Sequence, residues 1–446
     1  MAVPSSISLV ITLAAVRFLG IEAFGIWLIG RSIVQLTVNV TPGWSASLPV
    51  TMPAAGRRTS LALERRAERL TFGFGSLLGA ALLAVALALV QDSRLVYAFA
   101  LYWTGLFFSA HTSLTARGRC DGWRMSRGAL IDTVGAIAVL GVLSSGSLLL
   151  FIAAQGLRAW AKGLALRSRV RLDGSLLPNR RFSTRRRRVD RQLLRIGFPM
   201  VIRGWLQTAT QYGDRLLLGL FFGPVVAGAG GLGSTLALPL AVVASATATW
   251  IIPLSSRTTE GGRALPSVAR ECLLLGAFGV GLAMIVPSLS FFVAEVETHL
   301  QLVLSGFALL FGVAMSVLAG SFLISIGRLW VSNGLALFVV LSMAATMASV
   351  HALDLSPAVA LLLASTLSCL GSVIVLARFL GVSSWAVGAA VFVPLSGLVA
   401  LPLLASFLMS SAVQLSVAAV GLTIVAVGAW TFLSRRSTMT AVSEPR

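Results

Sequence analysis

Long apolar runs separated by short polar loops limit what this chain can fold into more than any other feature. A helix that crosses a bilayer needs about 20 consecutive, mostly apolar residues. Because 57% of the 446 residues are hydrophobic and 11% are charged, the chain has too little polar surface to fold in water. The sequence predicts an all-α polytopic membrane protein with about 14 transmembrane helices, at about 5–19, 24–54, 70–90, 95–116, 128–144, 147–166, 193–222, 225–256, 267–294, 300–326, 329–350, 357–377, 385–409 and 411–433.

The basic residues are distributed unevenly over this topology. A net charge of +20 would suggest nucleic acid as the partner of a soluble protein. With the N-terminus placed in the cytoplasm, however, 30 of the 35 basic residues lie on the cytoplasmic side, including thirteen from Arg158 to Arg195. Positive charge on that side is what orients membrane helices. We therefore expect a multi-pass protein of the cytoplasmic (inner) membrane, with both termini cytoplasmic and no nucleic-acid partner.

The longest polar interruption divides the chain into two parts. It is strongly basic, with six predicted helices before it and eight after it. We expect an N-terminal six-helix bundle at 1–166, a basic cytoplasmic connector at 167–192, a C-terminal six-helix bundle at 193–380, and two additional helices with a cytoplasmic tail at 381–446. The connector is interpreted as a solvated linker, although polybasic runs beside a membrane also attract anionic lipids.

A short internal echo accompanies this division. The segments Phe18–Gly25, FLGIEAFG, and Phe221–Gly228, FFGPVVAG, share the form F-x-G-x4-G and lie 203 residues apart. Each is expected to join the first and second helices of a bundle. An even number of helices in each repeat gives parallel repeats, related by an axis along the membrane normal. The echo therefore predicts two pseudo-symmetric bundles.

Polar side chains form stripes on two of the predicted helices. Residues four or seven positions apart fall on the same face of an α-helix. One stripe lies on the second predicted helix, at Arg31, Gln35 and Asn39. A longer stripe lies on the seventh, at Arg203, Gln207, Thr210 and Asp214. Arg215, the neighbour of Asp214, points about 100° away from this stripe and needs surroundings of its own.

The charges predicted inside the membrane leave an excess of two positive charges. They are Arg17, Arg31, Arg203 and Arg215 against Asp132 and Asp214. Charged side chains in membrane helices face a cavity or a partner, and the guanidinium group suits phosphate oxygens. We therefore expect a cavity that binds an anion. Its candidate residues are Arg31, Arg203, Arg17, Gln35, Asn39, Gln207, Asp214 and Arg215.

Other roles stay open for some of these residues. Asp214 can form a structural ion pair with Arg203 or Arg215, and Arg17 can extend to the membrane surface. Asp132 and Asp214 are also candidates for coupling transport to a proton or another cation. The sequence carries no G-x-S-x-G, H-E-x-x-H or Walker motif, and its three cysteines lie far apart. We therefore expect no enzyme activity, catalytic residue, metal or cofactor.

Two stretches of the sequence resemble one family of transporters. Residues 17–36, RFLGIEAFGIWLIGRSIVQL, are similar to the pattern R-x-L-G-x-x-x-F-G-x-[WY] that follows the first helix of polysaccharide flippases. Residues 193–224 are similar to the family's G-x-P opening, at Gly197 and Pro199, and to its D-R-x-x-[LI] segment, which starts at Asp214. These O-antigen-type exporters of lipid-linked oligosaccharides belong to the multidrug/oligosaccharidyl-lipid/polysaccharide exporter superfamily.

The resemblance implies both a function and a mechanism. In this family, two bundles surround a central cavity that opens alternately to each side of the membrane. The cavity moves an oligosaccharide linked to polyprenyl pyrophosphate to the outer leaflet, so that Arg31, Arg203 and Arg17 would meet the pyrophosphate. Enzymes of polysaccharide assembly are candidate partners besides the lipid bilayer. Two alternatives are a multidrug exporter of the same superfamily, against which the cationic excess counts, and a membrane-embedded enzyme of polysaccharide assembly.

Overall fold

The computed structural model describes most of the chain. The described residues are 2–40, 48, 57–89, 92–167, 183–244, 265–325, 328–380, 384–403 and 417–425. Within them, the side chains of residues 2–8, 40, 57–62, 82–89, 183–200, 265–267, 325, 380, 384, 402 and 403 are not described. Most of the predicted connector, the predicted C-terminal tail, and parts of the second, eighth and last two predicted spans lie outside the described residues.

The structure is almost entirely helical. Helices account for 94% of it, and no strand occurs in the part of the chain that is described. Within the same part, seven helices are long and apolar enough to cross a membrane. An eighth is added if residues 224–236 and 238–244, which meet at a bend of 41°, form one span. The predicted all-α membrane fold is confirmed.

The chain folds into two compact units, which are described here one at a time. Unit 1 comprises Met1–Leu19 and Gly30–Tyr212, and unit 2 comprises Gly20–Ile29 and Gly213–Arg446. The chain passes from one unit to the other inside α2 (Ile21–Val40) and inside α8 (Ser183–Phe222). The bundle boundaries expected at 166, 193 and 380 stay a prediction.

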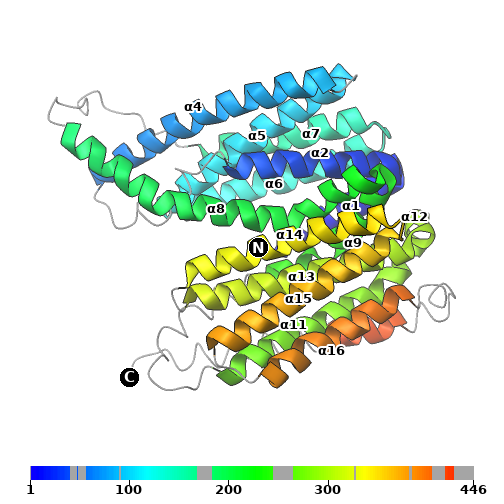
Figure 1. Cartoon of the computed structure of the whole chain (residues 1–446). Coiled ribbons are helices and arrows are strands. Elements are labelled where there is room, and N and C mark those ends of the chain that lie inside the picture. The colour runs from blue at the N-terminus through cyan, green and yellow to red at the C-terminus, as the bar shows by residue number, and fades with distance from the viewer. Residues whose placement is uncertain are drawn as a thin grey trace, which may run out of the picture. The chain divides into compact units, whose positions relative to one another are not determined.

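Among its described residues, unit 1 contains five helices besides its parts of α2 and α8. They are α1 (Ala2–Leu19), α4 (Arg57–Leu89), α5 (Ser93–Gly118), α6 (Gly122–Leu143) and α7 (Leu148–Leu166). α7 packs against both α5 and α6, α1 packs against α6, and α4 packs against α5 (Figure 1). Asp92, Asp121 and Ser147 accept hydrogen bonds from the first backbone N–H groups of α5, α6 and α7. These N-caps set where the three helices begin and so fix which residues lie halfway along each.

Unit 2 is organised around α13 (Leu300–Ser325). Within its most apolar window, 89% of the residues are buried, as expected for a helix that is apolar on every face. It packs against α9 (Pro224–Leu236), α14 (Leu329–Ala352), α15 (Pro357–Leu380) and α16 (Ser384–Leu403) (Figure 1). α11 (Leu265–Ile285) packs against α16. The chain then runs from α11 to α13 through the 3₁₀ helix η4 (Val286–Phe291) and α12 (Ala294–Thr298).

The two segments of the sequence echo have the same local structure. A single glycine separates α1 from α2 and α8 from α9. Gly20 has a φ of +80° and Gly223 a φ of +88°, a backbone region that glycine adopts without steric cost. Four residues later, the N–H of Phe24 donates to the carbonyl of Gly20 and that of Ala227 to the carbonyl of Gly223, both at 3.1 Å. Each glycine thus turns the chain and opens the next helix.

The last glycines of the two segments make a reciprocal contact within unit 2. A Cβ atom at Gly25 would lie 1.8 Å from the carbonyl oxygen of Pro224, and one at Gly228 would lie 2.2 Å from that of Ile21. Gly25 is equivalent to Gly228 in the two motifs, and Ile21 is equivalent to Pro224. The contact therefore has the form expected across a local two-fold axis. The superposition of whole bundles stays a prediction.

Candidate functional site

Arg31, on α2, lies in the interior of unit 1 between two tyrosines. Its guanidinium carbon is 5.8 Å from the centre of the Tyr212 ring on α8, a distance at which the ring face attracts a cation. The guanidinium group also interacts with Tyr102 on α5. No described residue accepts a hydrogen bond from its buried Nε atom. Because a buried donor without an acceptor costs about 1–3 kcal/mol, the position of Arg31 suits a bound anion.

The other residues of the α2 stripe tie this helix to its neighbours in unit 1. Gln35 interacts with the hydroxyl group of Tyr102. The Nδ2 atom of Asn39 donates a hydrogen bond to the Oγ1 atom of Thr208 on α8, at 2.8 Å. Gln35 therefore helps to position an aromatic neighbour of Arg31, whereas Asn39 holds α2 against α8.

The remaining candidate cations of unit 1 lie on α8 and α1. Arg203 and Gln207 are half-buried on α8, in the part of the helix that precedes Tyr212. Arg17 is exposed near the end of α1. The structure thus brings Arg31 and Gln35 together around Tyr102. It places Arg203 and Gln207 on α8, before Tyr212 in the sequence.

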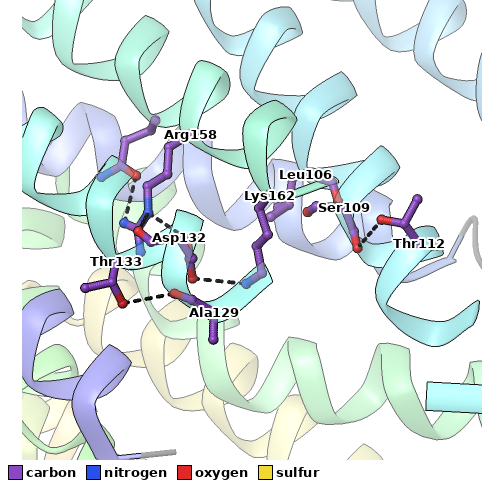
Figure 2. Close-up of polar contacts among 9 residues, drawn as sticks. Leu106, Ser109, Thr112, Ala129, Asp132, Thr133, Arg158 and Lys162 are labelled. Atoms are coloured by element: carbon purple, nitrogen blue, oxygen red, sulfur yellow. Dashed lines mark hydrogen bonds and ion pairs between the residues drawn. The ribbon is translucent and has the colours of Figure 1, made fainter. Parts of the chain in front are cut away.

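A second group of charges lies between α6 and α7, with Asp132 and Arg158 near the middle of their helices and Lys162 one turn further toward the end of α7. The carboxylate of Asp132 on α6 accepts a hydrogen bond from the Nε atom of Arg158 at 2.8 Å and contacts the ammonium of Lys162 at 3.1 Å. Figure 2 shows the carboxylate between the two cations of α7. We call Asp132, Arg158 and Lys162 the α6–α7 triad. Two positive charges share one negative charge here, so the triad has a net charge of +1.

Local sequence explains how the triad forms. Arg158 and Lys162 are four residues apart and therefore share a face of α7, and the NH1 group of Arg158 lies 3.4 Å from Gln155 one turn earlier. Opposite them on α6, Gly135 follows Asp132 by three residues. A Cβ atom at Gly135 would lie 2.9 Å from the Cγ atom of Arg158. The glycine therefore leaves room for the arginine stem to reach Asp132.

Tyr102 lies near both groups of charges in unit 1. Its hydroxyl interacts with the guanidinium of Arg31 and is also within electrostatic range of Arg158. Along α5, α6 and α7 the sequence contains one acidic residue, Asp132. Tyr102 is thus within electrostatic range of Arg31 and of the triad, and we call Arg31, Asp132, Arg158 and Lys162, which together carry net positive charge, the unit 1 cationic region.

Asp214 and Arg215 lie in the packed interior of unit 2, with 2% and 0% of their surfaces exposed. Ser234 on α9 donates a hydrogen bond to the Oδ2 atom of Asp214 at 2.5 Å. The NH2 group of Arg215 donates to the Oγ1 atom of Thr235 on the same helix at 3.0 Å. The guanidinium and the carboxylate approach to 4.0 Å. The pair is electrically neutral and joins α8 to α9.

Sequence reasoning missed the pairing of two residues of the triad. Arg158 and Lys162 were counted with the cytoplasmic charges and were not named as site residues, and the structure places both on α7, against Asp132. Their i, i+4 spacing within an apolar helix was the available signal. The aromatic neighbours of Arg31 were also missed, although Tyr102 and Tyr212 are two of only three tyrosines in the chain.

These features define the class as a polytopic membrane protein with a cationic region inside one of its units. No protein-family model matches the chain, and no curated protein sequence matches it. Among solved structures, the chain is similar to the lipid II flippase MurJ in an inward closed conformation, with a TM-score of 0.68, 13% identity, and 97% of each chain covered. This similarity shows the fold, which agrees with the prediction of about 14 helices.

Proposed function

We propose that this protein is an inner-membrane flippase that moves an oligosaccharide linked to polyprenyl pyrophosphate from the cytoplasmic to the outer leaflet. Its main support is Arg31, a buried cation whose Nε atom has no described acceptor, in a chain with the fold of a lipid II flippase. The proposal assigns the protein to the polysaccharide family of the exporter superfamily. Residues 17–36 resemble the sequence pattern of this family.

The physical task of such a protein explains why a buried cation is useful. Moving an ionised group from water into hydrocarbon costs far more than thermal energy, so a pyrophosphate does not cross a bilayer unaided. In the proposed mechanism, Arg31 provides a compensating charge and a hydrogen-bond donor inside a central cavity that opens alternately to each side. The polyprenyl tail remains in the lipid. The reaction is transport alone, and no residue is assigned a catalytic role.

The other candidate residues take different roles in this proposal. Arg203, and Arg17 at the end of α1, are further contacts of the head group, with Gln207 beside Arg203 on α8. Gln35 positions Tyr102, and Asn39 holds α2 to α8. Asp214 and Arg215 are assigned to bracing α8 against α9, because they are enclosed by protein. Asp132 and Asp214 stay candidates for coupling to a cation.

The test is flipping of a polyprenyl-pyrophosphate-linked oligosaccharide in liposomes, measured per correctly inserted protein molecule. Arg31→Ala removes a charge-assisted hydrogen bond of about 1.5–3 kcal/mol, so we expect flipping to fall by about tenfold or more. Arg31→Lys keeps the charge but lacks the planar fork of donors, and we expect partial activity. Arg203→Ala is expected to reduce flipping less, because the buried polar atom without a described acceptor belongs to Arg31 and not to Arg203.

Arg124→Ala is the matched control. Arg124 pairs with Asp121 at the start of α6, with 3.0 Å between Nε and Oδ2, and lies outside the unit 1 cationic region. This variant should flip at the wild-type rate. Wild-type flipping by both Arg31→Ala and Arg203→Ala, at normal protein levels, would refute the proposal.

A further inference from the structure

We propose that Arg158 and Lys162 form a second binding site for a phosphoryl anion, distinct from Arg31 and regulated by Asp132. The identity of the anion rests on the proposed function, whereas the site itself is argued from the α6–α7 triad. The expected ligand is a phosphate or pyrophosphate group on a lipid, because such a group can reach the interior of a membrane protein from the bilayer.

The first argument is the charge of the triad. One carboxylate is shared by a guanidinium and an ammonium group, at 2.8 Å and 3.1 Å, which leaves one positive charge uncompensated between α6 and α7. Uncompensated charge within membrane-spanning helices is expensive and is characteristic of a functional site. A structural ion pair does not need the second cation. The neutral pair Asp214–Arg215 in unit 2 provides that comparison within the same chain.

The second argument is access. Within the triad, the side chain of Asp132 is 15% exposed and that of Arg158 is 16% exposed, whereas that of Lys162 is 34% exposed. The ammonium group has three donors, so it can contact Asp132 and a ligand at the same time. The cation that is not needed for neutrality is therefore also the one that a ligand can reach.

The third argument is the position of Asp132. Its carboxylate accepts from Arg158 and Lys162 through different oxygens, Oδ1 and Oδ2. A phosphoryl group presents oxygens of the same charge to the same donors. Asp132 therefore competes with the ligand while also holding both cations on one face. Removing Asp132 should therefore strengthen binding of the anion, whereas removing Arg158 or Lys162 should weaken it.

The test is binding of farnesyl pyrophosphate to the purified full-length protein in phosphatidylcholine vesicles, measured by calorimetry. We expect Arg158→Gln and Lys162→Gln each to weaken binding by about tenfold or more, because each removes a charge-assisted contact. Asp132→Asn should strengthen binding by about threefold or more, because it removes a competing negative charge. Arg124→Gln, which breaks the pair at the start of α6, should bind like the wild type.

A purely structural triad gives a different pattern. Weaker binding in Asp132→Asn, or unchanged binding in Lys162→Gln, would overturn the inference. If Arg158→Gln does not fold, Lys162→Gln decides alone, because its side chain is the most exposed of the three. A folded triad variant is recognised by an unchanged elution volume and unfolding temperature.

The source of the phosphate is distinguished by repeating the titration with phosphatidylglycerol in the vesicles. If this lipid competes with farnesyl pyrophosphate in the wild type but not in Lys162→Gln, the site takes the phosphate of bilayer lipids. If it does not compete, the site takes the pyrophosphate of a polyprenyl substrate. Because binding is measured without transport and with Arg31 intact, a failure of this site can be told apart from a failure of the proposed flipping.

Discussion

The two units handle charge inside the protein in different ways. In unit 2, Asp214 and Arg215 are almost completely buried, balance each other, and are hydrogen-bonded to two hydroxyl groups of α9. In unit 1, the cationic region combines three cations and partly exposed side chains with a single carboxylate.

The comparison shows why the presence of charge in a membrane helix does not by itself identify a binding site. A neutral, enclosed pair has its counter-charge within the protein, so it is suited to holding helices together. A region with a surplus of charge and partial exposure still requires a counter-charge. The net charge of a group of residues and its exposure therefore distinguish residues that hold helices together from candidates for ligand binding.

Removing one member of the unit 2 pair is expected to have the largest effect on stability. Arg215→Ala leaves the carboxylate of Asp214 buried without its counter-charge, which typically costs about 3–5 kcal/mol. We expect a large fall in the thermal unfolding temperature in detergent and little inserted protein. The measurement is unfolding temperature together with the yield of the folded monomer.

The double variant Asp214→Ala with Arg215→Ala is the control for this prediction. It removes both charges, so it should recover much of the stability that Arg215→Ala loses. If the double variant is less stable than the single variant, the two residues do not act as a compensating pair, and the contrast between the units fails.

Much of the fold could be predicted because the bilayer constrains the sequence strongly. Apolar runs of membrane-spanning length predict helices, and the starts of α5, α6 and α7 follow recognisable N-cap residues. The echo around Gly20 and Gly223 was also readable, since both positions adopt a positive φ that favours glycine. The reciprocal contact of Gly25 and Gly228 could not be predicted, because it depends on how helices distant in sequence approach each other.

The site was predictable only along single helices. Helical periodicity placed Arg31, Gln35 and Asn39 on one face, but it contained no information about Tyr102 and Tyr212 on other helices. Arg158 was counted with the nearby run of basic residues, so its partner on α6 was not sought. Pairings between helices depend on packing, which a single sequence does not display.

Removing the shared acid of unit 1 is expected to affect stability much less. Asp132→Asn leaves two cations without their counter-charge, but the side chain of Lys162 is 34% exposed, whereas Asp214 and Arg215 are enclosed, so the cost should be smaller than for the unit 2 pair. We expect the unfolding temperature to fall by far less than in Arg215→Ala under the same conditions. An equal fall in both variants would show that the triad is as structural as the unit 2 pair.

The smallest effect is expected where a polar contact of unit 1 carries no charge. Asn39 donates to Thr208 at 2.8 Å and so joins α2 to α8, and hydrogen bonds between membrane helices contribute about 0.6 kcal/mol on average. Asn39→Ala and Thr208→Val should each lower stability slightly, and the double variant should lose less than the sum of the two, which a double-mutant cycle measures. Flipping by these variants should stay close to the wild-type rate, because Asn39 is assigned to packing. If Asn39→Ala instead abolishes flipping without changing stability, Asn39 acts on the substrate, and the functional region of unit 1 extends further along α2 than its charges indicate.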